Sequence, residues 1–427
     1  SGSSVTTPYT FLENAAHWSD KIFGTSDKGK LNHYLNEVSY GNFQFTKAIE
    51  TQGVVNDGII TVILDQNHPD TRNVGDIEPL LKTALAAADA FIDFASYDTG
   101  PKSPVFGENR IEKDELQIMF LIAGGEAATS AYPGVWAHAS AINGVVHDGV
   151  KVMSGTTGTT SSGVTTWYPE TYGGYSVFGE RWGSVDIIDS NYSEATIGVI
   201  AHELGHALWR LPDLYDIDAS SAGIGNFGLM GSGSYGYTSG EKKGTSPAHP
   251  TAWSKTRMGF VSAEVVTDTV TAKAVLATDN ASYKPLKIMT DRAEEYFLIE
   301  NRSTTGYDAG LYPIMPRDAS GVRSDFSGGM AIWHIDENQF IPDREPRWPD
   351  NRDETHKAVD LEEATLGGLD AKTNRGRLEN LFYQGNITSF TSLTTPNSNQ
   401  YDETSSGLSV TNIGAPSDSM SCDINFN

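Results

Sequence analysis

The sequence has almost no cysteine: Cys422 is the only one in 427 residues. A single cysteine excludes a disulfide within the chain, so the fold must depend on its hydrophobic core and on any metals that it binds. We interpret Cys422 itself as a small buried hydrophobic residue near the carboxyl end. The sequence also lacks any run of about 18 apolar residues, so no transmembrane helix is expected.

Basic residues are scarce relative to acidic ones. Lys and Arg number 30 against 55 Asp and Glu, which gives a formal net charge of −25. This acidity argues against nucleic acids and anionic membrane surfaces as partners, because both would repel the protein. It suits a soluble extracellular protein, a saline habitat or a calcium-binding protein, and net charge alone does not separate these.

The first residues lack an initiator Met, a basic segment and the apolar core of a secretory signal. We therefore interpret Ser1-Gly2-Ser3-Ser4 either as a remnant of expression or as the mature end of a processed chain. A signal peptide and a propeptide, if they exist, lie outside this sequence.

One stretch, residues 197–216 (IGVIAHELGHALWRLPDLYD), contains the pattern His-Glu-x-x-His at positions 202–206. Residues four apart on a helix lie on the same face, so His202 and His206 can both bind one zinc ion, at about 2.0–2.1 Å each. Glu203 follows the first ligand and can reach the open coordination position. There it can take a proton from water and return it to a leaving amine.

The surrounding residues favour a helix at this position. Apolar residues recur at helical spacing along it, at Ile197, Ile200, Ala201, Leu204 and Leu208. The alternative is that the two histidines are hydrogen-bonded core residues. Two imidazoles and a carboxylate on a buried helix need a shared partner, and a metal ion is the simplest one.

A zinc hydrolase normally supplies three protein ligands and leaves one position open to water. In the longer metzincin pattern the chain continues His-x-x-Gly-x-x-His or Asp. Here Trp209 occupies the glycine position, Pro212 occupies the ligand position, and Asp213 comes one place late. A one-residue insertion before Pro212 would make Asp213 the third ligand. The alternatives are Asp216, Asp218 and Glu241.

Several other segments are more specific than the zinc motif. They are LNEVSYGNF at 35–43, NFGLMGSGSY at 226–235, PAHPTAWSKTRMGF at 247–260, YFLIENRSTTGYDAGL at 296–311 and GGMAIWHID at 328–336. Together they resemble the immune inhibitor A group of secreted bacterial zinc metallopeptidases. The resemblance implies a metzincin-like peptidase that is secreted and often stabilised by calcium. Trp209 and the displaced Asp213 are the departures from the pattern.

The resemblance also implies roles for residues beyond the zinc helix. Met230 corresponds to a methionine in a tight turn that forms an apolar floor beneath the metal, although an ordinary core methionine would pack in a similar way. Tyr235 and Tyr237 are candidate donors to the oxyanion of the tetrahedral intermediate, with surface aromatic residues as the alternative. His138 and His249 are further candidates for the same donor.

Calcium is the second expected metal, and it prefers six to eight oxygen ligands. Asp216 and Asp218 form one candidate site, and the acidic residues between 93 and 114 form another. Neither has the spacing of an EF-hand, so solvated acidic loops are the alternative interpretation.

The pattern of apolar residues predicts an α+β fold. We expect helices at 10–23, 30–36 and 77–88, and strands at 43–49, 59–64 and 116–122. By resemblance, the core is metzincin-like, a twisted sheet plus the active-site helix, and residues 116–125 are its edge strand that pairs with extended substrate. Residues 152–166, rich in Gly, Ser and Thr, form either a surface excursion or a flap at the cleft rim.

The sequence also predicts the domain organisation. Residues 1–261 form the catalytic core, with an upper part at 1–211 and a lower part at 212–261 that contains the Met-turn. Residues 262–427 form a β-rich subdomain packed on the core. Its expected strands are 264–270, 285–289, 296–300, 330–335 and 408–413.

These observations lead to one prediction of function. The protein is expected to be a monomeric, secreted zinc endopeptidase that hydrolyses extracellular proteins, with Glu203 as general base. Two other classes remain open: a catalytically silent adhesin or binding protein on a peptidase fold, and a zinc amidase. A structural zinc site would have four protein ligands, whereas Glu203 beside His202 is typical of an open, catalytic site.

Overall fold

The structure is a computed structural model that describes residues 11–71, 74–100, 109–129, 133–142, 144–153, 158–159, 165–166, 174–182, 193–340, 351–365 and 367–426. The chain forms two compact units. Unit 1 contains Phe45–Arg210 with the segments up to Thr25 and at Lys30–Asn32. Unit 2 contains Leu211–Asn427 together with Ser26–Gly29 and His33–Gln44. The domain boundaries expected from the sequence stay a prediction.

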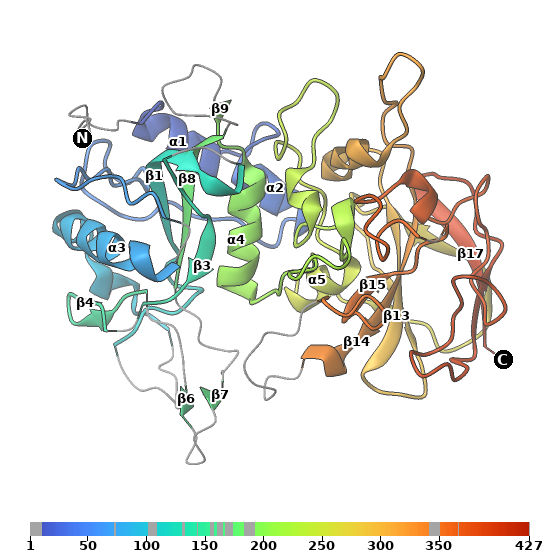
Figure 1. Cartoon of the computed structure of the whole chain (residues 1–427). Helices are drawn as coiled ribbons and strands as arrows, with labels where there is room; N and C mark the ends of the chain where they lie inside the picture. Colours follow the sequence, from blue (N-terminus) through green and yellow to red (C-terminus); the bar gives the residue numbers. More distant parts are fainter. Residues whose placement is uncertain are drawn as a thin grey trace. The chain divides into compact units, whose positions relative to one another are not determined.

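Unit 1 is built around a mixed sheet in the order β2-β1-β8-β3, with β9 also paired to β8. Strands β1 (Ile118–Glu126), β2 (Gly134–Val135) and β8 (Tyr175–Trp182) are parallel, and β3 (His138–Ser140) and β9 (Ser193–Glu194) run antiparallel to β8. Helix α3 (Val74–Ala88) lies on one side of this sheet and α4 (Ile197–Trp209) on the other (Figure 1). Apolar residues of α3 share a buried core with the strands, including Ile77, Leu81, Leu85, Tyr175 and Val177.

The helices predicted in this region are confirmed. They form α1 (Ala15–Phe23), α2 (Leu31–Val38) and α3. Helix α1 begins after Asn14, whose side chain accepts a hydrogen bond from the His17 N–H, as expected for an N-cap residue. The strand predicted at 116–122 is also present, as β1. It continues past the predicted end at residue 122 to Glu126, with an irregularity in its pairing between Ile122 and Gly125.

The strands predicted at 43–49 and 59–64 are wrong, because neither segment is a strand. In each segment, the backbone of one residue is hydrogen-bonded to a side-chain amide and not to a neighbouring strand. The Asn32 side chain bonds both the N–H and the carbonyl of Phe45, at 2.8 Å each. The Gln52 side chain does the same for Thr61, at 2.6 and 2.9 Å. Ile63 is 93% exposed, so the apolar run does not mark a buried strand.

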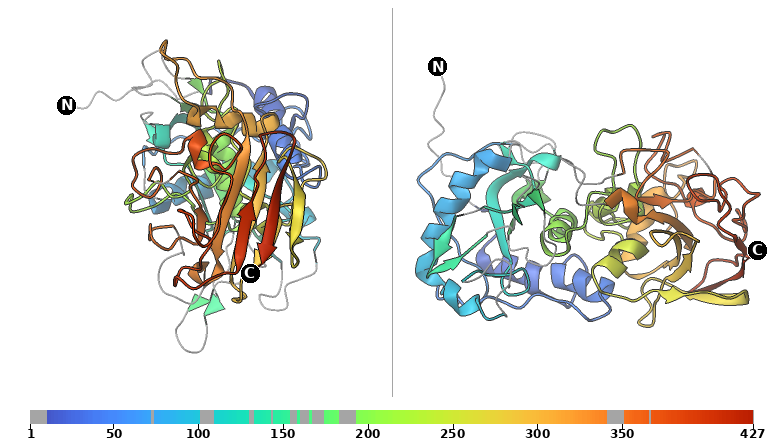
Figure 2. Two further views of the ribbon diagram at one scale, coloured as in Figure 1. Left: turned by 90° about the vertical axis from the view of Figure 1, so that its right-hand side faces the viewer. Right: turned by 90° about the horizontal axis from the view of Figure 1, so that it is seen from below.

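Unit 2 contains two sheets that enclose a second core. The larger has the order β10 (Glu264–Val265), β12 (Leu286–Met289), β13 (Glu295–Arg302), β14 (Gly329–Asp336) and β15 (Val359–Leu361). The smaller has the order β11 (Val270–Leu276), β17 (Ser419–Phe426) and β16 (Leu408–Thr411). In the left-hand view of Figure 2, the carboxyl-terminal strands are drawn in red near the label C. Apolar side chains from both sheets meet between them, including Val275, Ile288, Phe297, Ile332 and Ile424.

Strands therefore dominate the carboxyl-terminal part, as the sequence predicted, although the stretch 264–270 forms only β10 and the first residue of β11. Cys422 lies fully buried in the core of unit 2 with a free thiol, which confirms its interpretation as a small hydrophobic residue. Burial raises the pKa of this thiol to about 12.

The remaining elements are short. They are α5 (Ala252–Arg257), the strand pairs β4 (Val146–His147) with β5 (Val150–Lys151) and β6 (Gly158–Thr159) with β7 (Thr165–Thr166), and the 3-10 helices η1 (Asp89–Phe91), η2 (Phe94–Tyr97), η3 (Ala127–Thr129), η4 (Gly225–Phe227), η5 (Ser232–Tyr235), η6 (Gly306–Ile314), η7 (Glu337–Phe340) and η8 (Leu378–Asn380). None of the described helices has both the length and the apolar character needed to cross a bilayer.

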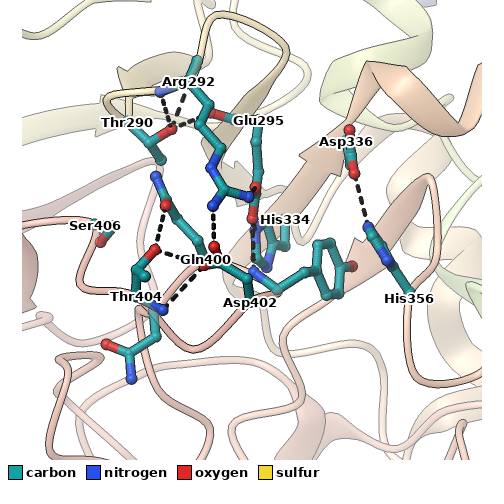
Figure 3. Close-up of polar contacts among 12 residues, drawn as sticks. Thr290, Arg292, Glu295, His334, Asp336, His356, Gln400, Asp402, Thr404 and Ser406 are labelled. Carbon is teal, nitrogen blue, oxygen red and sulfur yellow. Dashed lines mark hydrogen bonds and ion pairs between the residues drawn. The ribbon is translucent and has the colours of Figure 1, made fainter.

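A buried ionic cluster surrounds His334 on β14 (Figure 3). Its ring bonds Glu295 through Nε2 at 3.0 Å and Glu362 through Nδ1 at 3.2 Å. One face of the ring stacks on Tyr401, with the ring centroids 4.1 Å apart. Burial by itself lowers the pKa of His334, but the two carboxylates outweigh burial and raise the pKa to about 9.

This pKa predicts a pH dependence of stability in the alkaline range. A histidine with a pKa raised from 6.5 to about 9 stabilises the fold fully below pH 6.5 and loses that contribution as the pH rises through about 9. Between these values the free energy of unfolding should fall by up to about 1.4 kcal/mol per pH unit. Urea unfolding measured from pH 6 to pH 10 should show this slope in the wild type and a flatter one in His334→Gln. Equal slopes in the two proteins would contradict the prediction.

Candidate metal centre

Helix α4 holds the His-Glu-x-x-His residues in a mostly buried position. The helix follows Thr196 and packs against β8 and β3. Its apolar side chains are buried, and His202 and Glu203 are each only 7% exposed. The buried position fixes the side chains in place, because a packed helix leaves them few alternative rotamers.

The two imidazoles converge. Nε2 of His202 lies 3.2 Å from Nε2 of His206, and the ring planes are nearly perpendicular, at 86°. Two nitrogens bound at about 2.0–2.1 Å to one tetrahedral zinc ion lie roughly 3.3 Å apart, so the pair fits zinc without rearrangement. The arrangement that the sequence predicted for these two residues is therefore present.

Asp213 completes the cluster. Its carboxylate and the two imidazoles each offer a ligand atom, and these three atoms all lie within 4.8 Å of one another. Among the described residues, no other group of three His, Cys, Asp or Glu side chains meets the same condition. The alternatives Asp216, Asp218 and Glu241 are not part of the cluster. Two imidazoles and a carboxylate are a common ligand set for a hydrolytic metal.

The backbone turn after α4 explains why Asp213 comes one place late. Arg210 has a left-handed conformation, with φ 53° and ψ 36°, and its N–H bonds the carbonyls of Gly205 and His206. Arg210 therefore makes the turn expected of a glycine, one position after Trp209. From this turn to Asp213 is three residues, the spacing of Gly to ligand in the longer metzincin pattern. The additional residue thus lies in the last turn of the helix.

A comparison with known families agrees with this geometry. The model for the family "Immune inhibitor A peptidase M6, catalytic domain" matches residues 9–261, more than half of the chain. The chain belongs to the immune inhibitor A (M6) peptidase family. A comparison with curated proteins found no match.

Membership of the family makes this protein a metallopeptidase, a hydrolase with protein substrates. It confirms the resemblance drawn from the sequence segments and implies a metal ion, which the cluster of two histidines and an aspartate fits. The individual role of each residue stays a prediction.

In this peptidase, two backbone hydrogen bonds hold Leu214, the residue after Asp213. The N–H of Leu214 donates to the carbonyl of Met230 at 2.8 Å, and the carbonyl of Leu214 accepts the N–H of Ile224 at 2.9 Å. Met230 is buried, 1% exposed, so the methionine expected beneath the metal is packed in the core. Its backbone carbonyl holds the loop that carries Asp213, while the apolar floor formed by its side chain stays a prediction.

The calcium candidate Asp216 has a structural function in the same loop. Its carboxylate accepts hydrogen bonds from the N–H groups of Asp218, Ala219 and Ser221 and from the Ser220 hydroxyl. Burial raises the pKa of Asp216, but these bonds outweigh burial and hold the pKa below its usual value. Asp218 is exposed and accepts a bond from the Ser220 N–H. A calcium site here stays a prediction.

Two further expectations fall partly on residues that the structure does not describe. The second calcium candidate, between 93 and 114, includes residues 101–108, and most of the loop at 152–166 also lies outside the described residues. Both stay predictions.

The candidate oxyanion donors are not part of the metal cluster. Tyr237 packs edge-on against Tyr312, with ring centroids 5.8 Å apart, and Tyr235 ends the partly buried helix η5. His249 Nε2 lies 3.0 Å from Glu37 Oε1. His138 contacts the Trp136 carbonyl through Nδ1 and the Tyr175 hydroxyl through Nε2. The oxyanion role of each stays a prediction.

One buried residue that contacts the segment before Met230 was missed by sequence reasoning. Arg302 on β13 is fully buried and donates from Nη1 to the Phe227 carbonyl at 2.6 Å. It also pairs with Asp308. Burial raises the pKa of Asp308, but Arg302 outweighs burial and holds that pKa far below its usual range. The available signal was the run of polar residues Glu300, Asn301 and Arg302 directly after the apolar stretch of this strand, and it indicates only that partners exist.

The close approach of Gly223 to the backbone of Leu214 allows a test of how firmly Leu214 is held. Gly223 has φ +56°, and a Cβ there would lie 2.2 Å from the Leu214 carbonyl oxygen. Gly240 has φ +84° with open space around its Cβ position, so Gly240→Ala is a matched control. Both substitutions incur the left-handed backbone cost of about 1–2 kcal/mol. Gly223→Ala should lower the free energy of unfolding by a further 1–3 kcal/mol or so, since the backbone must shift.

Chemical denaturation of the two variants and the wild type measures this difference. Equal destabilisation by Gly223→Ala and Gly240→Ala would mean that the loop accommodates a side chain at position 223, and that Leu214 is not held as described.

Proposed function

We propose that the protein is a secreted, zinc-dependent endopeptidase with a metzincin-like core, in which His202, His206 and Asp213 bind the catalytic zinc. The observation that carries this proposal is the convergence of three ligand atoms within 4.8 Å on one continuous segment. The nearly perpendicular imidazoles leave room for a tetrahedral ion, and three protein ligands leave a fourth position for water.

Glu203 is the general base in this proposal. Zinc in such a site makes water nucleophilic near neutral pH and polarises a peptide carbonyl. The Glu203 carboxylate accepts the proton of the attacking water and then donates it to the departing amine nitrogen. Its buried position supports this role, because exclusion of solvent strengthens the interaction of a carboxylate with developing charge.

Strand β1 is the proposed docking edge for extended substrate. Residues Ile118–Ile122 pair with β8 on one side, and among the described strands none pairs with the other side. The unpaired backbone groups of such an edge can bond a peptide in the extended conformation. Since backbone groups are common to all sequences, this mode of binding favours broad specificity.

The remaining expectations belong to the same proposal. Tyr235 or Tyr237 donates to the oxyanion, the Met230 side chain forms the apolar floor of the site, and Asp216 with Asp218 binds a structural calcium ion. The protein acts outside the cell as a monomer. The resemblance to the family supports the assignments of Met230 and of calcium, and the chemistry of a phenol donor supports those of the tyrosines.

Replacement of the general base should separate zinc binding from catalysis. Glu203→Gln keeps the shape of the side chain but cannot accept a proton, so casein cleavage should fall by about 10²–10⁴-fold. The zinc content of the variant, measured by atomic absorption, should equal that of the wild type. In the wild type, a chelator should abolish cleavage and added zinc should restore it. Unchanged cleavage by Glu203→Gln, or in the presence of the chelator, would refute the mechanism.

Replacement of the third ligand should weaken zinc binding. Asp213→Asn removes the charged ligand, so the zinc dissociation constant, measured by chelator competition, should rise at least about tenfold. Asp325→Asn is the matched control, because Asp325 is an exposed aspartate outside the cluster to which no metal is assigned. If the two variants bind zinc equally tightly, Asp213 is not a ligand.

A further inference from the structure

The peptide groups of Leu214, the residue directly after Asp213, are fully hydrogen-bonded. Its N–H donates to Met230, and its carbonyl oxygen accepts one bond from the Ile224 N–H and a second from Nδ2 of Asn351, at 3.1 Å. The one donor and both acceptor positions of Leu214 are thereby used. The side chain of Leu214 is completely buried, so this backbone is fixed by packing as well as by hydrogen bonds.

Asn351 connects this loop to the large sheet of unit 2. Its side chain is completely buried and pairs with the peptide of Val359, the first residue of β15. Nδ2 donates to the Val359 carbonyl at 2.8 Å, and Oδ1 accepts the Val359 N–H at 3.2 Å. The other hydrogen of Nδ2 bonds Leu214. The amide therefore ties the residue next to the third ligand to the edge strand β15.

We propose that Asn351 is a positioning residue of the metal centre, which holds the Asp213 carboxylate where it meets the two imidazoles. This inference rests on the proposed zinc site. The position of a ligand is set by the backbone that carries it, and partners that orient metal ligands affect metal affinity. Asn351 lies outside residues 9–261, so the matched catalytic segment does not contain every residue that shapes its metal centre.

The chemistry of an amide suits this role. Asn351 must donate to two carbonyl oxygens and accept from one N–H at the same time, and a neutral amide does both at every pH. A carboxylate of the same shape would place an acceptor opposite the Leu214 and Val359 oxygens. Leu214 would then lose one of its bonds and move away from β15.

The variant Asn351→Asp tests this inference, with Asn301→Asp as a matched control. Asn301 is also buried, 1% exposed, and its Nδ2 also donates to two carbonyls, those of Val275 and Ser417. Both variants should lower Tm. Only Asn351→Asp should weaken zinc binding, by about tenfold in chelator competition. It should also change the visible absorption spectrum of the Co²⁺-substituted protein, which reports the geometry of the ligands.

The possible outcomes separate this inference from the function on which it rests. If the wild type binds no zinc, both are overturned. If the wild type binds zinc, and Asn351→Asp has wild-type affinity and an unchanged Co²⁺ spectrum despite a lower Tm, Asn351 only stabilises the fold and the inference fails.

If Asn351→Asp does not fold, the milder Asn351→Ser and hydrogen exchange provide the test. Faster exchange at the Leu214 and Ile224 amides than in the wild type, together with weaker zinc binding, would support the inference. Unchanged exchange and unchanged affinity would overturn it.

Discussion

The metal centre depends on how the backbone leaves helix α4. The helix brings two imidazole nitrogens to one point, and Asp213, which follows so soon after the helix, can reach that point only because the chain reverses at once. Arg210 makes this reversal in a left-handed conformation that costs a residue with a side chain about 1–2 kcal/mol. Such a cost persists only where surrounding contacts fix the backbone, and here the bonds of the Arg210 N–H to the last turn of the helix contribute to this.

Beyond the turn, the loop that carries Asp213 is supported by backbone contacts and by polar side chains from distant parts of unit 2. Leu214 contacts Met230 and Ile224 through the backbone and Asn351 through a side-chain amide. Arg302 holds the carbonyl of Phe227 in the neighbouring segment. Polar contacts of this kind specify position more sharply than apolar packing, because a hydrogen bond weakens steeply when its angle changes.

The features that the sequence predicted are those formed by residues close together in the chain. The pair His202 and His206 was predictable, since the spacing within one helix determines their geometry. Asp213 was predictable only as one of several acids, because the turn at Arg210 has no glycine to mark it. Asn351 was not predictable, since its partner is 137 residues away in the chain. The prediction of strands at 43–49 and 59–64 was wrong for a similar reason. The amides of Asn32 and Gln52, which lie outside these segments, bond backbone groups within them.

The burial of Cys422 has a consequence for where the protein can fold. A thiol with a pKa near 12 contains almost no thiolate at neutral pH, so oxidants and other thiols have little to react with. With no partner cysteine in the chain, folding includes no step of disulfide formation or exchange. The stability of the native state therefore does not depend on a disulfide within this chain, in reducing or in oxidising surroundings.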